Sequence, residues 1–390
     1  MRKKDVQQMN KNLFLFNHRK EINRLLNKWM SDKHYDVRNL LDCNSEYLMA
    51  FGEKSNGKST AFQMLLCIIN VLFGAESVLL RLYDEDFKKG RAEKMFAGVP
   101  NEFIKDITNG KYDEIVYKHY GWYFAKYNQD EEKYIMPEKP FCHRLCILNA
   151  GSSFQFPEVE VIFFDEFIRK DTNRNVPEEF VEFQTVISTV KRDKTSLQIL
   201  MAGNTVNYYS CYFKEMGLTN IRNQKQGTID TYQYGESELS VSVEYCDTPI
   251  GKDKSSNKYF AFNNPKLQMI TSGKWQLDIY PHLPVRYRPK DVILSYYIKF
   301  DDAMFQCDIV SRDNNLFTYI FNENIKTPDF SCDIIYMQQY DGRPNINRFI
   351  NKCTTEWQKY IWLFFIQNKV FYQDNQVGDI IRAYLKWCLA

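Results

Sequence analysis

One octapeptide constrains the fold of this chain more than any other feature. Residues 52–59 read Gly-Glu-Lys-Ser-Asn-Gly-Lys-Ser and match the phosphate-loop pattern G-x-x-x-x-G-K-[S/T] at every fixed position. Residues 46–51 (EYLMAF) predict a buried strand before the loop, and residues 60–73 (TAFQMLLCIINVLF) predict a buried helix after it. A strand, a tight loop and a helix in this order are the context in which such a loop holds phosphate groups.

The residue types in this segment suit contact with a triphosphate. Gly52 and Gly57 let the backbone turn tightly, so that N–H groups point at phosphate oxygens. Lys58 is predicted to reach the β- and γ-phosphates, and the Ser59 hydroxyl to bind Mg²⁺. We therefore predict ATP and Mg²⁺ as ligands. The remaining predicted nucleotide contacts of this segment are Lys54, Ser55, Asn56 and Thr60.

A second apolar strand, residues 161–164 (VIFF), ends in two acids. Asp165 is placed to hold the hydration shell of Mg²⁺, and Glu166 to orient and deprotonate the attacking water. Many strands end in an acid, but a pair downstream of a phosphate loop predicts nucleotide hydrolysis. The doublet favours ATPases of the additional-strand type over GTPases, whose N-K-x-D element is absent from the sequence.

Composition limits the class of protein. At about 150 residues per domain, 390 residues suffice for two domains. The net charge of +2 gives no overall electrostatic case for nucleic acid, so any such surface must be local. Ten cysteines without a Cys-x-x-Cys predict reduced thiols, and the spacing of Cys142, His143 and Cys146 matches no common zinc pattern. With no long apolar run and no signal-peptide pattern, we expect a soluble intracellular protein.

Strand and helix candidates alternate up to about residue 225. This order predicts an α/β fold, a parallel sheet with helices on both faces. The strand candidates lie at 77–83, 145–149, 159–164 and 197–202, and a helix candidate lies at 177–190. Beyond residue 280 the pattern predicts a smaller α+β domain. Its strand candidates are 293–300, 303–311 and 316–321, with a hairpin turn at 312–315 and helices after 357 and around 380–388.

Four segments follow from this pattern. We predict a basic helical arm (1–37), a P-loop ATPase domain (38–227), a linker region (228–280) and a C-terminal domain (281–390). The apolar spacing around Ile22 and Leu26 fits either a docking arm or an ordinary first helix with a solvated basic face. Residues 102–140, rich in Tyr, Lys and Asp, predict a half-exposed insertion.

Two further positions carry side chains that can contact a nucleotide. Residues 191–194 (Lys-Arg-Asp-Lys) lie between a helix and a strand, where Arg192 can project into a neighbouring subunit's nucleotide site or form part of a solvated turn. Asn204 follows the strand at 197–202 and can contact a γ-phosphate, although Asn is common in turns for other reasons.

The segments around these residues resemble one family. Residues 161–171 (VIFFDEFIRKD) resemble the acid segment of the encapsidation protein, the DNA-packaging ATPase, of small protein-primed tailed bacteriophages of the phi-twenty-nine type. Three more segments resemble that family in the same order: 186–194 (VISTVKRDK), 197–206 (LQILMAGNTV) and 371–387 (FYQDNQVGDIIRAYLKW). The chain is longer than the best-known member, mainly through the N-terminal arm and the 102–140 insertion.

The resemblance implies a role for individual residues and a set of partners. Arg192 falls at the arginine finger that completes a neighbour's site, Asn204 in the coupling motif and Lys54 at a basic switch position. Lys58, Ser59, Asp165 and Glu166 keep the roles given above. The implied motor is a homomeric ring, described as pentameric, on the portal (connector) of a prohead, with a structural packaging RNA and double-stranded viral DNA. Its implied place is the host cytoplasm, without membrane contact.

The resemblance also implies that the C-terminal domain is RNase H-like and has lost its nuclease site. A two-metal nuclease needs several converging carboxylates. The acids of this region form no D-x-D or E-x-x-K cluster on one strand face, which favours a non-cleaving domain, although Asp301 and Asp302 come close to the expected strand end. The acids considered are Asp301, Asp302, Asp308, Asp313 and Asp333.

Several alternatives stay open at this stage. Arg286, Arg288 and Lys290 flank Tyr287 and suit either a phosphate-tracking surface or a solvated connection. As an enzyme, the chain is a packaging ATPase, a terminase-like ATPase with a working nuclease domain, or a helicase-like DNA translocase. As a non-enzyme, it is a scaffold that nucleotide binding opens and closes.

Overall fold

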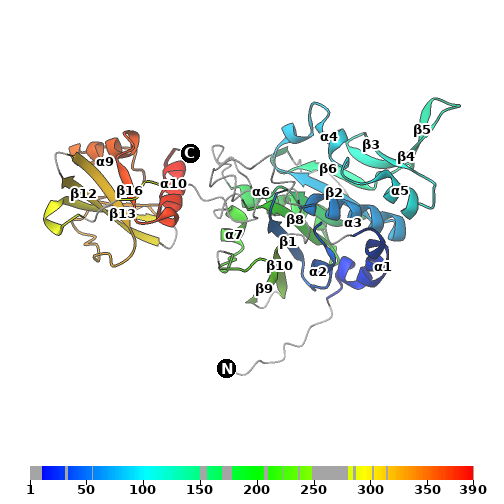
Figure 1. Ribbon diagram of the computed structural model, residues 1–390, viewed down its shortest axis with the longest axis horizontal. Coiled ribbons are helices and arrows are strands. Elements are labelled where there is room, and N and C mark those ends of the chain that lie inside the picture. The colour runs from blue at the N-terminus through cyan, green and yellow to red at the C-terminus, as the bar shows by residue number, and fades with distance from the viewer. Residues whose placement is uncertain are drawn as a thin grey trace, which may run out of the picture. The chain divides into compact units, whose positions relative to one another are not determined.

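The computed structural model describes most of the chain, in two compact units (Figure 1). The described residues up to 247 form the first unit, and those from 280 onward form the second. The described ranges are 11–30, 34–54, 56–149, 156–168, 178–205, 210–221, 223–235, 238–247, 280–283, 287–300, 303–312 and 315–389.

A ten-stranded sheet runs through the first unit. Its main path has the order β3-β4-β6-β2-β7-β8-β1-β10-β9, and β5 pairs with β4. The strands from β6 to β10 along this path are parallel, while β4 and β9 join antiparallel. The bounds are β1 (Tyr47–Gly52), β2 (Glu76–Arg81), β3 (Glu114–Lys118), β4 (Gly121–Asn128), β5 (Lys133–Ile135), β6 (Cys142–Cys146), β7 (Val159–Asp165), β8 (Gln198–Asn204), β9 (Thr228–Tyr234) and β10 (Leu239–Tyr245).

The order of three central strands decides the class of sheet. Strand β8 lies between β1, which leads into the phosphate loop, and β7, which ends in the acid pair. All three are parallel, so the loop and the acids meet at the same carboxyl-terminal edge of the sheet. The extra strand between them confirms the predicted additional-strand arrangement.

Helices cover both faces of this sheet (Figure 1). Helix α3 is buried almost throughout from Ala61 to Ile69, as its nearly continuous apolar sequence predicts, and the Phe62 ring lies 5.2 Å from that of Phe163 on β7. Gly74, with a φ of 68°, ends α3 in the left-handed conformation that favours glycine. The helical elements are α1 (Phe14–Trp29), α2 (Arg38–Leu41), α3 (Lys58–Phe73), η1 (Asp84–Phe87), α4 (Arg91–Lys94), α5 (Asn101–Ile107), η2 (Ile147–Asn149), α6 (Glu179–Lys191) and α7 (Cys211–Glu215).

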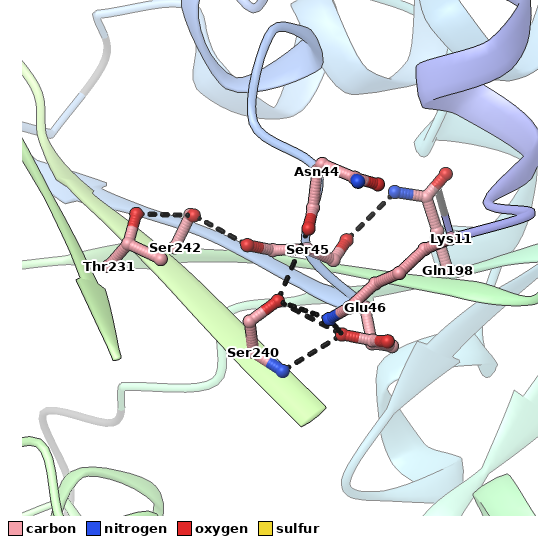
Figure 2. Close-up of polar contacts among 8 residues, drawn as sticks. All are labelled: Lys11, Asn44, Ser45, Glu46, Gln198, Thr231, Ser240 and Ser242. Carbon is pink, nitrogen blue, oxygen red and sulfur yellow. Dashed lines mark hydrogen bonds and ion pairs between the residues drawn. The ribbon is translucent and has the colours of Figure 1, made fainter. Parts of the chain in front are cut away.

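The described part of the predicted N-terminal arm is an ordinary first helix. Leu15, Ile22 and Leu26 of α1 are fully buried in the core that also contains α3. The segment just before α1 is also bound to the sheet, because Lys11 Nζ donates to Glu46 Oε2 at 2.9 Å and to Ser240 Oγ at 2.9 Å. Figure 2 shows this polar cluster at the beginning of β1 and β10. A separate arm over 1–37 is therefore wrong for residues 11–30, and residues 1–10 lie outside the described ranges.

Two further boundaries in the first unit differ from the prediction. The predicted ATPase–linker boundary at 227/228 is wrong, because β9 and β10 complete the sheet, with β10 parallel to β1. Residues 102–140 are about half exposed, as predicted, and their strands β3 and β4 form one margin of the sheet, from which the β4–β5 hairpin projects (Figure 1). The strand expected at 145–149 is β6, three residues earlier, followed by the single turn η2.

The second unit contains a six-stranded sheet of order β15-β14-β11-β12-β13-β16. Strands β11, β12 and β13 form an antiparallel meander, and β14 and β15 extend it in parallel beside β11. Strands and helices in this unit agree with the predicted α+β pattern, and the pairing of Arg312 with Asn315 confirms the predicted hairpin. The bounds are η5 (Pro289–Asp291), β11 (Val292–Phe300), β12 (Ala303–Arg312), β13 (Asn315–Phe321), β14 (Ile335–Met337), β15 (Ile346–Asn347), α9 (Glu356–Ile366), β16 (Val370–Tyr372) and α10 (Asn375–Leu389).

One buried carboxylate of the second unit is fully engaged. Asp308 on β12 accepts hydrogen bonds from the Tyr287 hydroxyl at 2.8 Å, Ser295 Oγ at 2.7 Å and Gln306 Nε2 at 2.8 Å. Tyr287 thus faces the sheet, while the exposed Arg288 pairs with Asp291 at 3.5 Å. Lys290 is exposed, and Asp333 Oδ2 accepts from the Asp329 N–H at 2.8 Å. Arg286, Asp301, Asp302 and Asp313 lie outside the described ranges.

Metal-binding clusters and membrane-spanning helices are both absent from the ranges given above. No group of three or more His, Cys, Asp or Glu side chains gathers there as a metal site would require. His143 lies instead with Nε2 at 2.6 Å from Glu76 Oε2. None of the helices in the same ranges is both long and apolar enough to cross a membrane.

Candidate active site

The lysine of the phosphate loop, Lys58, is hydrogen-bonded to other residues of the same loop. Lys58 begins α3 and is buried, and its Nζ donates to Glu53 O at 2.7 Å and to Asn56 Oδ1 at 3.0 Å. The same Asn56 oxygen accepts from the Lys58 backbone N–H at 3.3 Å. The side-chain oxygen of Asn56 therefore occupies donors that such a loop offers to phosphate oxygens.

Two oxygen donors meet where a magnesium ion is expected. Ser59 Oγ lies 2.8 Å from Asp165 Oδ1, across the gap between the start of α3 and the end of β7. Burial raises the pKa of Asp165, and the neighbouring Arg81 guanidinium and the Ser59 hydroxyl oppose that rise. A hydroxyl and a carboxylate are hard oxygen ligands of the kind Mg²⁺ prefers. The residues at this position therefore fit the predicted ion.

Arg81 connects the two acids and was missed by the sequence analysis. Its Nη2 lies 2.7 Å from Asp165 Oδ2, and its Nη1 lies 2.5 Å from Glu166 Oε2. Burial disfavours the charged guanidinium, but both carboxylates favour it and together raise its pKa. Arg81 is the last residue of β2, which pairs with β7, so strand pairing alone brings it to the acids. Its only signal in the sequence was an arginine at the end of an apolar strand.

Glu166 lies at the rim of the site. Its backbone has a φ of 61°, in the left-handed region that non-glycine residues rarely adopt, and its side chain is 63% exposed. Backbone strain of this kind, of order 1–3 kcal/mol, is commonly found where a functional side chain needs a particular direction. In this structure that direction is toward Arg81.

A cavity of about 500 Å³ joins these groups within the first unit. Asn204 lines it, and its Oδ1 lies 3.5 Å from Lys58 Nζ. The polar lining comprises Lys54, Asn56, Gly57, Lys58, Ser59, Thr60, Glu166 and Asn204. The rest of the lining is more apolar and comprises Trp29, Met30, His34, Tyr35, Ala61, Met64, Gly98 and Pro100.

Of the other predicted nucleotide contacts in the loop, Gly52 does not line this cavity. Gly52 ends β1, and its carbonyl accepts from the Thr205 N–H at 3.0 Å. A Cβ at Gly52 would meet Cys246 Cβ at 3.0 Å, so glycine suits the close approach of β1 and the end of β10. Ser55 lies outside the described ranges.

Arg192 lies at the opposite edge of the sheet from the acids. Helix α6 follows β7 and ends just before β8, so its last turn lies near the amino-terminal ends of the parallel strands. Arg192 is exposed there, at the C-terminal end of α6. The seven residues of β8 span roughly 20 Å at about 3.3 Å per residue, which separates Arg192 from the edge holding Asn204. The structure therefore does not bring Arg192 to this chain's own acids.

The strand order, the phosphate loop and the acid pair together define a P-loop ATPase fold of the additional-strand type. The family model of the Podovirus DNA encapsidation protein (Gp16) matches residues 30–248, more than half of the sequence. The chain belongs to this family.

Individual relatives agree with the family assignment. The DNA packaging proteins of Bacillus phage PZA and Bacillus phage phi29 are each 23% identical over 199 residues, which is 50% of this chain and 54% of theirs. The chain thus spans about half the length of the curated relatives it matches. Among solved structures, the bacteriophage Phi-29 viral genome packaging motor assembly contains a chain with a TM-score of 0.54 and 16% identity, covering 90% of this chain and 98% of that one. At that identity the likeness supports the fold alone.

Proposed function

We propose that this chain is the ATPase subunit of a viral DNA-packaging motor, which couples ATP hydrolysis to movement of double-stranded DNA into a preformed prohead. One observation carries the proposal. The segment matched by the encapsidation family, residues 30–248, is the segment that holds the phosphate loop and the acid pair at one sheet edge. The names of the two phage relatives, both DNA packaging proteins, support the same substrate.

The cavity suits ATP along its length. The triphosphate would lie on the loop, against the backbone N–H groups at the start of α3, with Lys58 on the outer phosphates. The base would lie against the more apolar end, near Trp29 and Pro100. The Trp29 ring is held rigidly for that contact, because its Nε1 donates to Asp106 Oδ2 at 2.9 Å.

Ser59 and Asp165 would hold Mg²⁺, which when bound supplies charge neutralisation at the phosphates. Lys58 has to release the Asn56 oxygen before it can contact a phosphate, so binding exchanges an internal hydrogen bond for one to the nucleotide. Glu166 has to turn away from Arg81 before it can accept a proton from water. Nucleotide binding and hydrolysis therefore each require one of these side chains, Lys58 or Glu166, to change partners.

Arg81 is paired with the two acids of this site, so a second cation for the transferred group would come from elsewhere. Charge developing on the transferred group is commonly stabilised by an arginine that a neighbouring subunit supplies. Arg192 lies on the far edge of the sheet, where it is suited to reach another subunit's site. This supports a homomeric ring, which we propose is a pentamer.

The remaining partners follow from the proposed motor. The ring would sit in the host cytoplasm on the prohead portal, together with a structural packaging RNA. Its DNA contacts should be mainly to phosphates, because a packaging motor has to pass any sequence. The RNase H-like unit would be a non-cleaving domain, since Asp308 is occupied by three donors from its own unit.

A DNA-stimulated ATPase assay on the purified full chain tests the proposal. We expect Mg²⁺-dependent hydrolysis that rises when duplex DNA of any sequence is added. Nucleotide binding without DNA-stimulated hydrolysis would instead identify a scaffold. Metal-dependent nicking of the same DNA would identify a terminase-like enzyme with a working nuclease, and strand separation would identify a helicase-like one.

A further inference from the structure

A residue outside the phosphate-loop motif holds one of the loop's peptide units. The backbone N–H of Tyr35 donates to the carbonyl oxygen of Asn56 at 2.8 Å. In a trans peptide the C=O and the next N–H point in opposite directions, so this bond also sets the direction of the Gly57 N–H. That N–H is one of the phosphate-binding donors expected of the loop.

The loop needs such a support because its own conformation is demanding. Gly57 has a φ of 92°, and a Cβ added there would lie 3.2 Å from His34 Cβ, so the segment containing His34 and Tyr35 presses directly on the loop. A phosphate on the loop would compete for the Lys58 donors that the Asn56 side chain now holds. The bond from Tyr35 uses the Asn56 carbonyl oxygen, an acceptor that phosphate oxygens do not bind, so nucleotide binding does not have to break it.

Tyr35 is itself held by a buried hydrogen bond to the sheet. It is 5% exposed, and its hydroxyl donates to Glu244 Oε2 at 2.7 Å. Glu244 is 6% exposed and lies on β10, directly beside Ala50 of β1 in the register of the parallel pair. The Tyr35 ring packs at 5.8 Å from the Phe62 ring on α3. A chain of contacts therefore runs from the sheet, through a buried hydroxyl–carboxylate pair, to the loop backbone.

We propose that Tyr35 is a positioning residue for nucleotide binding, and that its hydrogen bond to Glu244 holds the segment that orients the Asn56–Gly57 peptide. ATP affinity then depends on a pair of residues that the phosphate-loop motif does not contain. The inference rests on the proposed function of this cavity as a nucleotide site. Tyr35 and Glu244 hold the loop in place before nucleotide binds, which lowers the entropy cost of binding.

The chain offers a matched control for this pair. Tyr212 on α7 is fully buried, and its hydroxyl donates to Glu179 Oε1 at 2.9 Å, with Glu179 6% exposed. Both are buried tyrosine–glutamate hydrogen bonds in the first unit, but the Tyr212 ring packs against residues outside the phosphate loop, namely Phe164, Phe167, Phe180 and Phe183. Tyr35→Phe and Tyr212→Phe each delete one hydroxyl and keep the ring.

The experiment measures the Kd of a fluorescent ADP analogue with Mg²⁺ for the full chain and each variant, together with the melting temperature. We expect Tyr35→Phe to weaken binding by about five- to tenfold, the order expected for one lost hydrogen bond. Tyr212→Phe should lower the melting temperature to a similar extent and leave Kd within the scatter of wild type. In steady-state hydrolysis, Tyr35→Phe should raise KM and leave kcat unchanged.

A second variant keeps the test decisive if Tyr35→Phe is too unstable to purify. In Glu244→Gln the amide oxygen still accepts the Tyr35 hydroxyl, so we expect wild-type affinity, whereas Glu244→Leu removes the acceptor and should weaken binding. The inference is overturned if Tyr35→Phe or Glu244→Leu binds like wild type, or if Tyr212→Phe is weakened equally. If the wild-type chain binds no nucleotide at all, the proposed function fails instead.

Discussion

The Arg81 guanidinium holds the Glu166 carboxylate, with Nη1 at 2.5 Å from Oε2, while its second nitrogen holds the buried Asp165. A carboxylate held by an arginine guanidinium points toward that partner and not toward a water molecule on the phosphate. The proposed catalytic base is therefore restrained by the last residue of the neighbouring strand, β2, and hydrolysis requires that pair to separate.

Removing this restraint should change how hydrolysis is controlled. For Arg81→Gln we expect ATP hydrolysis without DNA to rise and its stimulation by DNA to shrink, because Glu166 no longer has to leave its partner. The Mg²⁺ concentration for half-maximal activity should increase, since Arg81 lowers the pKa of Asp165 and its loss favours the protonated acid. Arg81→Lys, which keeps the charge, is the control. A fall in basal rate at saturating Mg²⁺ would show that Arg81 assists the reaction itself.

Glu166→Gln tests the base. The variant keeps the shape and hydrogen-bonding capacity of the side chain but cannot take a proton at neutral pH. We expect nucleotide affinity within a few-fold of wild type and a loss in kcat of about 10²- to 10⁴-fold, the usual contribution of a general base. Equilibrium binding and single-turnover hydrolysis separate the two effects. Turnover near that of wild type would exclude Glu166 as the base.

Arg192 should act on another subunit. Arg192→Ala alone is expected to lower hydrolysis by about 10³-fold or more, the contribution of an arginine finger. Mixing it with Glu166→Gln, which keeps Arg192, should restore part of the activity, because some sites then combine an intact base with a neighbour's arginine. The adjacent exposed Lys191→Ala serves as the control and should hydrolyse ATP like wild type. Absence of any recovery on mixing would point to a role within one chain.

Glu244 should make stability depend on pH in a defined direction. Burial raises its pKa from the ordinary 4.5 to about 7, with the Tyr35 hydrogen bond opposing the rise. Between these two values the folded chain binds a proton that the unfolded chain does not, so the free energy of unfolding falls as pH rises from 4.5 to about 7. Above pH 7 this contribution is constant. The measurement is the melting temperature of wild type minus that of Glu244→Gln across pH 5–8.5, and a difference that does not vary with pH would contradict it.

Much of the fold follows from patterns a few residues long. The strands on either side of the loop, the buried helix α3 and the antiparallel meander of the second unit all formed where their apolar periodicity predicted. The errors arose where pairing partners are distant in sequence. The linker predicted at 228–280 contains strands β9 and β10, because no local pattern shows that β10 pairs with β1, almost two hundred residues earlier. The prediction placed β6 three residues too late, because the apolar residues of the following turn, η2, resemble those of a strand.

The chemistry of the phosphate loop and the acid pair, and the family to which they point, can be read from short segments of sequence. Tight glycine turns, a lysine at a helix start and acids at a strand end are requirements met within a few residues. The groups that surround them are set by how distant strands pair. Arg81 reaches the acids because β2 pairs with β7, Tyr35 reaches the loop because β10 carries Glu244 beside β1, and Arg192 lies on the far edge because α6 runs antiparallel to the strands. Such placements depend on long-range strand order, which no local pattern encodes.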